Sequence, residues 1–363
     1  RARSIRRGAL RRATPLSLRT GYREVHPMID KKPLGRSGTE ISGIGLGCVT
    51  FGREIDEDQS YRILDYAVEK GVTFLDTAEV YGGGQAREGR KQSYEVDDVR
   101  ETTGEMSSSE RIIGRWMRAR GSRDKVTICT KVSTGGSPEN IARALRDSLE
   151  NLRTDHIDVH KMHSWDDDAP IDETIAGISV GVEAGQVGVI GCSNYSADQI
   201  QAALDASAKG GHPRFKITQP PYNLARPPTA YGHTAREEVE DEILPLCRRE
   251  GIAVTPYSPL GAGFLAGKYV NDKSKFPSRT RFDVSPGHAD IYFTERNFGI
   301  VERLRAKADE LGIPMVRLAM AFAMTHPDVT AVLVGARETR HIDNAVEAYE
   351  MGLDPELRAE MAA

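Results

Sequence analysis

The sequence lacks any long apolar run. No stretch of about 18 consecutive apolar residues, the length that a helix needs to cross a bilayer, occurs in the chain. We therefore expect no membrane association.

Cysteine is also scarce. The four cysteines, Cys48, Cys129, Cys192 and Cys247, are widely spaced, and three of them lie inside apolar, strand-like stretches. This spacing argues against a disulfide framework and against a cysteine-rich metal site. We expect free thiols in the core of a cytoplasmic protein.

Positive charge is scarce outside the first residues. Residues 1–27 carry eight arginines and one acid, Glu24, so the remaining chain has 41 basic and 52 acidic residues and a net charge of −11. This acidic body argues against nucleic acid as a partner. The head has the composition of an organellar transit segment. We instead interpret residues 1–27 as an N-terminal extension outside a fold that spans residues 28–363.

From residue 40 onward, short apolar runs alternate with longer amphipathic stretches, a pattern typical of parallel βα units. No Gly-x-Gly-x-x-Gly motif follows the first run, as it would in a doubly wound dinucleotide-binding sheet. There are eight runs, which favours an α/β fold of the (β/α)8 TIM-barrel type. The predicted strands are Gly43–Cys48, Val72–Asp76, Val126–Lys131, Ile157–His163, Val187–Cys192, Phe215–Gln219, Ile252–Tyr257 and Thr330–Val334.

Several helix starts are predicted from capping patterns. Residues 107–110 (Ser-Ser-Ser-Glu) and 196–199 (Ser-Ala-Asp-Gln) match capping boxes. Ser137 precedes Pro138, which places an N-cap before a proline in the first helical position.

Four polar side chains lie at or just beyond the carboxyl ends of predicted strands. Asp76 ends the second strand, Tyr81 follows it in a loop, Lys131 ends the third strand and His163 ends the fourth. Each has a structural explanation when taken singly: a helix cap, a rim lysine or a satisfied polar residue. In a (β/α)8 barrel, however, these strand ends meet at the catalytic face.

Together these side chains suit the reduction of a carbonyl group. A proton must reach the carbonyl oxygen as hydride reaches the carbon, and a tyrosine with its usual pKa of about 10 is a slow acid. A nearby ammonium lowers that pKa. We therefore expect Lys131, held by Asp76, to tune Tyr81, and His163 to hydrogen-bond the substrate oxygen.

A metal site is the rival interpretation, because Asp158, His160 and His163 are close in sequence. In a regular strand His160 and His163 point to opposite faces. We therefore expect no metal at this position.

The motif Asp76-Thr-Ala-Glu-Val-Tyr81-Gly resembles the signature of the aldo-keto reductase superfamily, in the branch with the potassium-channel β subunits and bacterial general-stress reductases. The opening residues 34–38 and 45–52 resemble that branch's N-terminal β-hairpin and first strand. The resemblance covers about residues 31–350 and implies a barrel with long βα loops. Further matching pieces follow in order at residues 191–195, 257–261, 267–269 and 335–337.

The resemblance implies NADPH as the cofactor and assigns residues to it. Tyr81 would be the general acid, with Asp76, Lys131 and His163 supporting it. Ser193, Asn194 and Gln219 would hold the nicotinamide carboxamide, and Tyr257 would stack on the ring. Residues Ser258, Leu260, Gly261 and Lys268 would lie along the pyrophosphate, and residues Gly335, Arg337, Arg279 and His341 would contact the adenosine end.

The adenosine end departs from the family pattern. His341, Asn344 and Ala345 stand where this branch has Gln and Glu-Asn, so adenine binding is expected to differ. Arg337, with Arg340 or Arg279, still offers cations for a 2′-phosphate. NADPH therefore remains favoured over NADH.

The expected partner is a small carbonyl or sugar substrate, and a homo-oligomer remains open. A regulatory or redox-sensing subunit with little turnover is the alternative function. The presence of all four of Asp76, Tyr81, Lys131 and His163 favours a working reductase.

Residues 85–108 form an insertion between Tyr81-Gly-Gly and the Ser109-Glu110 that begins the next helix in the family. The segment is rich in charge and has no periodic apolar face. It is either an unstructured excursion, a lid docked over the pocket by Tyr94, Val96 and Met106, or a subunit contact.

Overall fold

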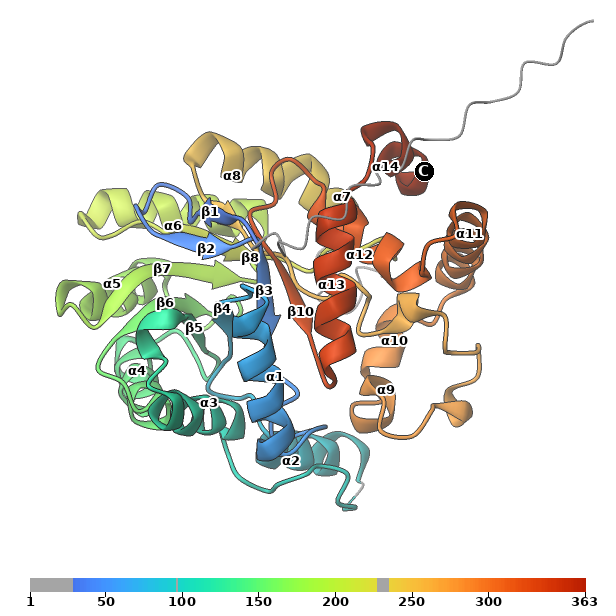
Figure 1. Cartoon of the computed structure of the whole chain (residues 1–363). Coiled ribbons are helices and arrows are strands. Elements are labelled where there is room, and N and C mark those ends of the chain that lie inside the picture. Colours follow the sequence, from blue (N-terminus) through green and yellow to red (C-terminus); the bar gives the residue numbers. More distant parts are fainter. Residues whose placement is uncertain (1–28, 96, 227–234) are drawn as a thin grey trace, which may run out of the picture.

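A computed structural model of the chain describes residues 29–95, 97–226 and 235–363. Eight parallel strands lie side by side in the order β10-β3-β4-β5-β6-β7-β8-β9 (Figure 1). They are β3 (Ile44–Gly47), β4 (Phe74–Asp76), β5 (Thr127–Val132), β6 (Ile157–Met162), β7 (Val187–Ser193), β8 (Ile217–Gln219), β9 (Ala253–Val254) and β10 (Val332–Gly335).

The two ends of this strand series meet and close the barrel. Tyr257, just beyond β9, forms a parallel bridge with Leu333 of β10, and the amide of Thr330 donates to the carbonyl of Val254 at 2.8 Å. All eight predicted strands are present, so the prediction of a (β/α)8 barrel is confirmed. Several strands are shorter than predicted, because apolar residues at their ends lie in loops.

A helix follows each strand and packs on the outside of the barrel. These helices are α1 (Glu57–Glu69), α3 (Ser108–Arg120), α4 (Pro138–Leu152), α5 (Ile171–Glu183), α6 (Ala197–Gly210), α8 (Leu244–Glu250), α12 (Met315–Met324) and α13 (Thr339–Met351). Additional helices lie in the connections and at the C-terminus: α2 (Gly83–Tyr94), α7 (Arg236–Glu238), α9 (Arg281–Val284), α10 (His288–Tyr292), α11 (Glu295–Leu311) and α14 (Pro355–Ala362).

The predicted N-terminal hairpin is present and lies against the barrel floor. Strands β1 (Lys31–Pro33) and β2 (Glu40–Ser42) pair antiparallel. Leu34 and Ile41 from this hairpin are buried in the same cluster as Phe74 inside the barrel. The hairpin therefore covers the amino-terminal mouth, and the carboxyl ends of the strands remain available for the site.

The barrel interior has two distinct layers. The lower layer is apolar and consists of the inward residues Phe74, Cys129, Val159, Val189, Ile217, Ala253, Ala331 and Leu333. Two residues further along four of these strands, the same inward face carries Asp76, Lys131, Lys161 and Gln219, all of them buried. Because side chains alternate with a period of two along a strand, a polar layer lies directly above the apolar one.

Two of the three predicted helix starts are confirmed. Ser196 and Gln199 form a capping box at α6, and the Ser137 side chain caps α4 ahead of Pro138. The capping box predicted for residues 107–110 is wrong. Ser107 adopts a left-handed conformation and its hydroxyl donates to the carbonyl of Glu79 at 2.6 Å, whereas Glu110 is buried and accepts from Thr130.

The insertion contains a helix, α2, so the interpretation of residues 85–108 as wholly unstructured is wrong. A Cβ at Gly83 would clash with the carbonyl oxygens of Gly52 and Thr103, which shows how closely this helix packs on its neighbours. The only charged side chain that α2 buries is Arg90, which pairs with the buried Glu101. This helix is held by glycine and ion-pair contacts, so apolar periodicity could not predict it.

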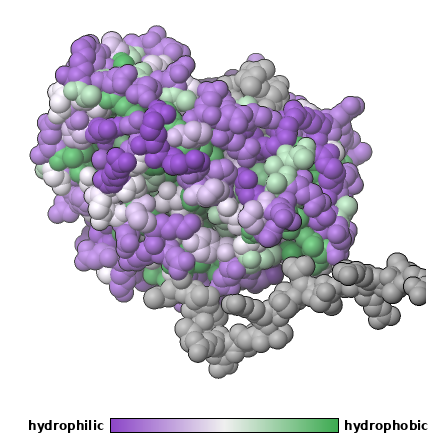
Figure 2. Space-filling model, turned by 90° about the horizontal axis from the view of Figure 1, so that it is seen from above, coloured by the Kyte–Doolittle hydropathy of each residue, from purple (hydrophilic) through white to green (hydrophobic). Residues whose placement is uncertain are grey.

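The remaining chain shows the expected distribution of side chains. All four cysteines are free and buried, which confirms the prediction for them. Figure 2 shows a face that is largely hydrophilic, with hydrophobic residues in small separate patches. Within the described residues, no helix is both long and apolar enough to cross a membrane. The N-terminal extension lies outside the described residues.

Candidate active site

A cavity of about 440 Å³ opens at the carboxyl ends of the strands. Its lining includes strand-terminal residues from five strands: Gly47, Asp76, Ser193, Gln219 and Gly335. Tyr81 and His163 line the same cavity. The predicted polar residues therefore converge where a (β/α)8 barrel carries its chemistry.

Asp76 lies at the base of this cavity and holds two lysines. The Lys131 ammonium donates to Asp76 Oδ2 at 2.7 Å and to the carbonyl of Thr77 at 2.7 Å, while Lys161 donates to Asp76 Oδ1 at 3.2 Å. Burial by itself would raise the pKa of Asp76, but the two ammonium groups outweigh it and lower the pKa to about 2. Asp76 is therefore ionised and fixes both cations.

Tyr81 lies above this charged group. The Lys131 Nζ is 4.8 Å from the centre of the Tyr81 ring, a cation–π distance. Burial, followed by the charge of Asp76, raises the pKa of the Tyr81 phenol well above its usual value, and the cations that oppose this shift are Lys161 and Arg53. The sequence had pointed to Lys131 as the tuning cation, whereas in the structure Lys131 contacts the ring face.

His163 packs edge-on against Tyr81, with ring centroids 5.5 Å apart. Its Nδ1 forms a 2.6 Å hydrogen bond with the hydroxyl of Ser133, which leaves Nε2 for a ligand. Burial, assisted by the nearby Lys131, lowers the pKa of His163 to about 3. The ring is therefore neutral and can donate through Nε2 when Ser133 donates to Nδ1.

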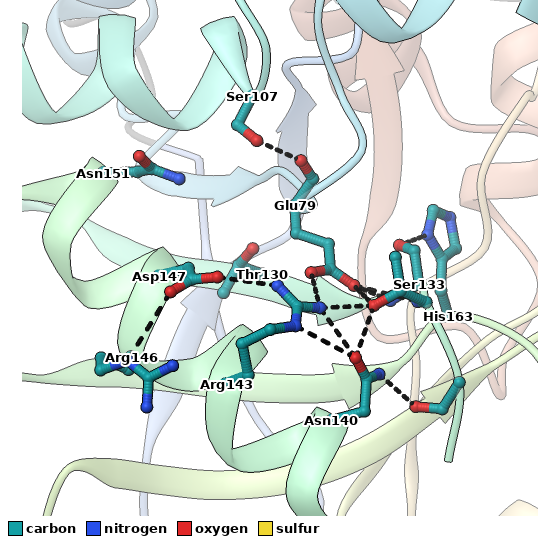
Figure 3. A network of polar contacts seen from close by, with 12 residues as sticks. Glu79, Ser107, Thr130, Ser133, Asn140, Arg143, Arg146, Asp147, Asn151 and His163 are labelled. Atoms are coloured by element: carbon teal, nitrogen blue, oxygen red, sulfur yellow. Dashed lines mark hydrogen bonds and ion pairs between the residues drawn. The ribbon is translucent and has the colours of Figure 1, made fainter. Parts of the chain in front are cut away.

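A polar network behind His163 sets the position of Ser133 (Figure 3). The Glu79 carboxylate accepts from the amides of Ser133 at 2.5 Å and Thr134 at 3.0 Å, and it pairs with Arg143 at 3.1 Å. Glu79 belongs to the same signature segment as Asp76 and Tyr81. This segment therefore also orients His163, indirectly, through Ser133.

The residues assigned to the carboxamide form one wall of the cavity. The Ser193 hydroxyl donates to the carbonyl of Gln219 at 2.8 Å, and the Asn194 amide donates to the carbonyl of His163 at 2.9 Å. The Tyr257 hydroxyl donates to Asn194 Oδ1 at 2.8 Å. Asn194 adopts a left-handed φ of 59°, a strained conformation that is common at binding sites.

The opposite end of the cavity is positively charged. Lys268 and Arg337 line it, with Ser258, Leu260 and His341. Burial lowers the pKa of Lys268, and the charges of Arg337 and Arg340 add to this shift. Among the described residues no carboxylate pairs with Lys268, so its local field favours a bound anion. This end fits the phosphates of a nucleotide cofactor.

Some assigned residues have other roles in the structure. His341 Nδ1 accepts from the amides of Arg337 at 3.1 Å and Glu338 at 3.3 Å, so it caps α13 as well as lining the cavity. Gly261 does not line the cavity, and neither does Arg279, which donates to the carbonyl of Glu54 at 3.3 Å. Arg337 donates to the carbonyl of Arg279.

Four residues that the sequence did not single out lie at the site. Arg53 and Glu54 form a bidentate pair at 2.8 and 2.9 Å in the cavity wall, and Arg281 lines the wall beside them. No sequence signal marks these loop residues. Lys161 could have been found, because strand periodicity places it on the same inward face as Val159. The same periodicity puts His160 on the other face, where its ring nitrogens make no hydrogen bond with any described residue.

The insertion lies beside this cavity without lining it, as far as its described residues extend. Its Thr102 amide donates to the carbonyl of Arg53 at 3.1 Å, and Arg100 pairs with Asp283 of α9 at 2.9 Å. Tyr94 and Met106 are partly exposed and do not line the cavity, and the Tyr94 hydroxyl lies against Gly287, just before α10. Val96 lies outside the described residues. The insertion thus contacts two segments of the cavity wall, at Arg53 and at α9.

Comparison with known proteins gives a consistent result. Residues 43–363 match the model of the aldo/keto reductase family. The chain is 31% identical over 332 residues to a probable voltage-gated potassium channel subunit beta of Arabidopsis thaliana, covering 88% of this chain and 91% of that protein. It is 30% identical over 338 residues to the uncharacterized oxidoreductase YrpG of Bacillus subtilis, covering 89% and 92%. It is 26% identical over 353 residues to an aryl-alcohol dehydrogenase [NADP(+)] of Phanerodontia chrysosporium, covering 88% and 81%.

Proposed function

The chain belongs to the aldo/keto reductase family, and from that premise we propose that it is an NADPH-dependent reductase of small carbonyl compounds, with Tyr81 as general acid and base. One observation carries the proposal: a cavity that has Asp76, Tyr81 and His163 at one end and, at the other, Lys268, which pairs with no carboxylate in the described part of the chain. The first end suits a carbonyl and the second suits a phosphate.

The chain's residues would act on the substrate oxygen. His163 Nε2 donates a hydrogen bond to the carbonyl oxygen and polarises it. The bound cofactor supplies hydride to the carbonyl carbon. Tyr81 transfers its phenolic proton to the oxygen, and in the oxidative direction the phenolate takes the proton back. Asp76 holds Lys131 against the Tyr81 ring, which keeps the ring in place beside the substrate oxygen.

The cofactor would lie along the wall from Ser193 to Arg337. Ser193, Asn194 and Gln219 would hold the carboxamide, and Tyr257 would stack on the nicotinamide. Residues Ser258, Leu260 and Lys268 would follow the pyrophosphate. Arg337, with Arg279 behind it, would meet the 2′-phosphate. The printed name of the Phanerodontia chrysosporium relative, which includes NADP(+), supports this cofactor.

The substrate would be an aldehyde, a ketone or the carbonyl form of a sugar. The cavity that holds Tyr81 is also lined by Val49, Thr50 and Tyr292 together with the charged Arg53 and Glu54. This mixture suits a molecule with both apolar and hydroxyl groups.

A regulatory NADP-binding subunit is the second candidate, because the Arabidopsis thaliana relative is named as a channel subunit. The two functions differ in turnover. We would mix the purified full chain with NADPH and a panel of aldehydes, ketones and sugars, and count the NADPH molecules oxidised per protein. Many turnovers with at least one substrate support the reductase. A slow reaction that stops near one equivalent favours the regulatory subunit, and no reaction rejects the proposal.

A further inference from the structure

Lys161 is a buried cation whose role the reductase chemistry above leaves unexplained. It lies on β6 with no measurable exposure, and its ammonium contacts Asp76 Oδ1 at 3.2 Å and the Gln219 side-chain oxygen. Asp76 already pairs with Lys131 through its other oxygen at 2.7 Å. Two ammonium groups therefore share one carboxylate, and the barrel interior keeps one positive charge in excess.

Such an arrangement is costly for stability. Burying an ammonium is unfavourable unless a full counter-charge accompanies it, and an apolar side chain at that position would pack without this penalty. In the layer below, the inward residue of β6 two positions earlier is Val159, an apolar side chain that is buried without this cost in free energy. The second lysine is therefore better explained by a chemical role than by folding.

The excess charge lies where it acts on Tyr81. The charge of Asp76 opposes ionisation of the Tyr81 phenol, while the charges of Lys161 and Arg53 favour it. The titratable and charged groups that face Tyr81 or Lys161 are Asp76 of β4, Cys129 and Lys131 of β5, His163 after β6, Cys192 of β7, Arg53 of the loop after β3, and Tyr257 after β9. Two carboxylates lie among or beside these groups: Asp76, whose charge Lys131 matches, and Glu54, whose charge Arg53 matches.

Gln219 connects Lys161 to the proposed cofactor wall. Its side-chain oxygen accepts from Lys161, and its amide nitrogen donates to Asp76 Oδ2 at 3.3 Å. The lysine thus fixes which way the Gln219 amide points, since an ammonium can only donate.

We propose, on the basis of the reductase function above, that Lys161 is a positioning residue whose ammonium supplies the excess positive charge that stabilises the Tyr81 phenolate. The two lysines have different roles. Lys131 neutralises the charge of Asp76 and contacts the Tyr81 ring, and Lys161 gives the cluster of Asp76 and the two lysines a net positive charge.

The test is the titration of Tyr81 in the NADP-bound protein. Lys161→Met removes the charge and keeps an unbranched side chain, and Lys161→Gln is a polar second variant in case the Met variant folds poorly. Val159→Ala is the matched control, because it disturbs the same face of β6 without changing charge. Protein labelled at tyrosine 13Cζ reports each phenol by NMR, and Tyr81→Phe identifies the Tyr81 signal.

We expect the Tyr81 midpoint to rise by about one pH unit when Lys161 is replaced. A nearby opposite charge shifts a pKa by about 1–3 units, and the contact of Lys161 with Asp76 offsets part of its charge. The sign follows from the charge: without the cation the phenolate is less stable, so ionisation needs a higher pH. Alcohol oxidation requires the phenolate, so its rate at a fixed pH below the midpoint should fall about tenfold.

A midpoint that is the same in Lys161→Met, Val159→Ala and the parent overturns the proposal. So does a Tyr81 midpoint that is lower in Lys161→Met than in the parent. The NMR titration does not depend on catalysis. The proposal for Lys161 and the proposed reductase function can therefore be rejected independently of each other. A shifted midpoint without any carbonyl reduction rejects the reductase and keeps the Lys161 role, whereas reduction without a shift does the opposite.

Discussion

The two layers of the barrel interior are built from the same strands but differ in chemistry. Phe74, Val159 and Ile217 fill the lower layer, and Asp76, Lys161 and Gln219 occupy the same inward faces one step higher. The lower residues bury apolar surface, which stabilises the fold. The upper residues bury charge, which costs stability unless it is paired.

The comparison shows how a barrel separates stability from chemistry. The N-terminal hairpin covers the apolar end with Leu34 and Ile41, so water reaches the interior from the other end. Charges placed there act in a partly dry environment, where their effect on a nearby phenol is larger than in water. Substitutions in the upper layer should therefore change chemistry, and those in the lower layer should change stability.

The largest effect is expected for Tyr81→Phe, which removes one oxygen atom above the charged layer. Carbonyl reduction should fall by about a thousandfold or more, because general acid catalysis contributes about 10²–10⁴-fold. The dissociation constant of NADPH should stay within a few-fold, and the unfolding midpoint should be unchanged. Steady-state kinetics and fluorescence titration measure the two quantities. A variant that keeps full activity would remove Tyr81 from the mechanism.

Arg337→Ala tests the cationic end of the cavity and should have a smaller effect. A charge-assisted bond to phosphate contributes about 1.5–3 kcal/mol, so NADPH should bind about ten to a hundredfold more weakly. NADH lacks the 2′-phosphate and provides the control, since its affinity should scarcely change. Equal losses for the two cofactors would mean that Arg337 acts on the fold, through its contact with Arg279.

Val159→Ala should have the smallest effect on activity. Val159 is completely buried in the lower layer, and its truncation should lower the free energy of unfolding by about 2 kcal/mol through lost burial and the cavity left behind. The value of kcat/KM should remain within twofold of the parent. Urea unfolding and steady-state rates check both. A large loss of activity at unchanged stability would contradict the division between the layers.

The fold could be predicted from the sequence because the signals were periodic. Eight apolar runs, a matching number of amphipathic stretches and several capping residues each reflect local physics that tertiary packing does not override. The capping box predicted for residues 107–110 failed for a tertiary reason. The insertion brings Ser107 against the carbonyl of Glu79, and Glu110 is buried beside Thr130.

The site could be predicted in part. Asp76, Tyr81 and His163 end up in one cavity because the carboxyl ends of parallel strands converge, and this follows from the strand assignment alone. Arg53 and Arg281 come from loops whose course depends on long-range contacts, so no local pattern marks them. The inward position of Lys161 could have been predicted from the alternation of side chains along the strand, which also places His160 and His163 on opposite faces.

The insertion was the least predictable region. Its helix α2 depends on a buried ion pair between Arg90 and Glu101 and on close packing of Gly83, neither of which produces a hydrophobic pattern. Its described residues contact Arg53 and α9 and do not line the cavity. Its effect on substrates would therefore be indirect, through the position of the cavity wall.

The most direct test of the account is the fate of deuterium from NADPH labelled at both C4 positions. The full chain is incubated with this cofactor and the best carbonyl substrate of the panel, and the product is analysed by NMR over many turnovers. The account predicts one deuterium on the former carbonyl carbon of every product molecule, with no such product from Tyr81→Phe. Product without deuterium at that carbon, or labelled product formed equally well by Tyr81→Phe, would contradict it.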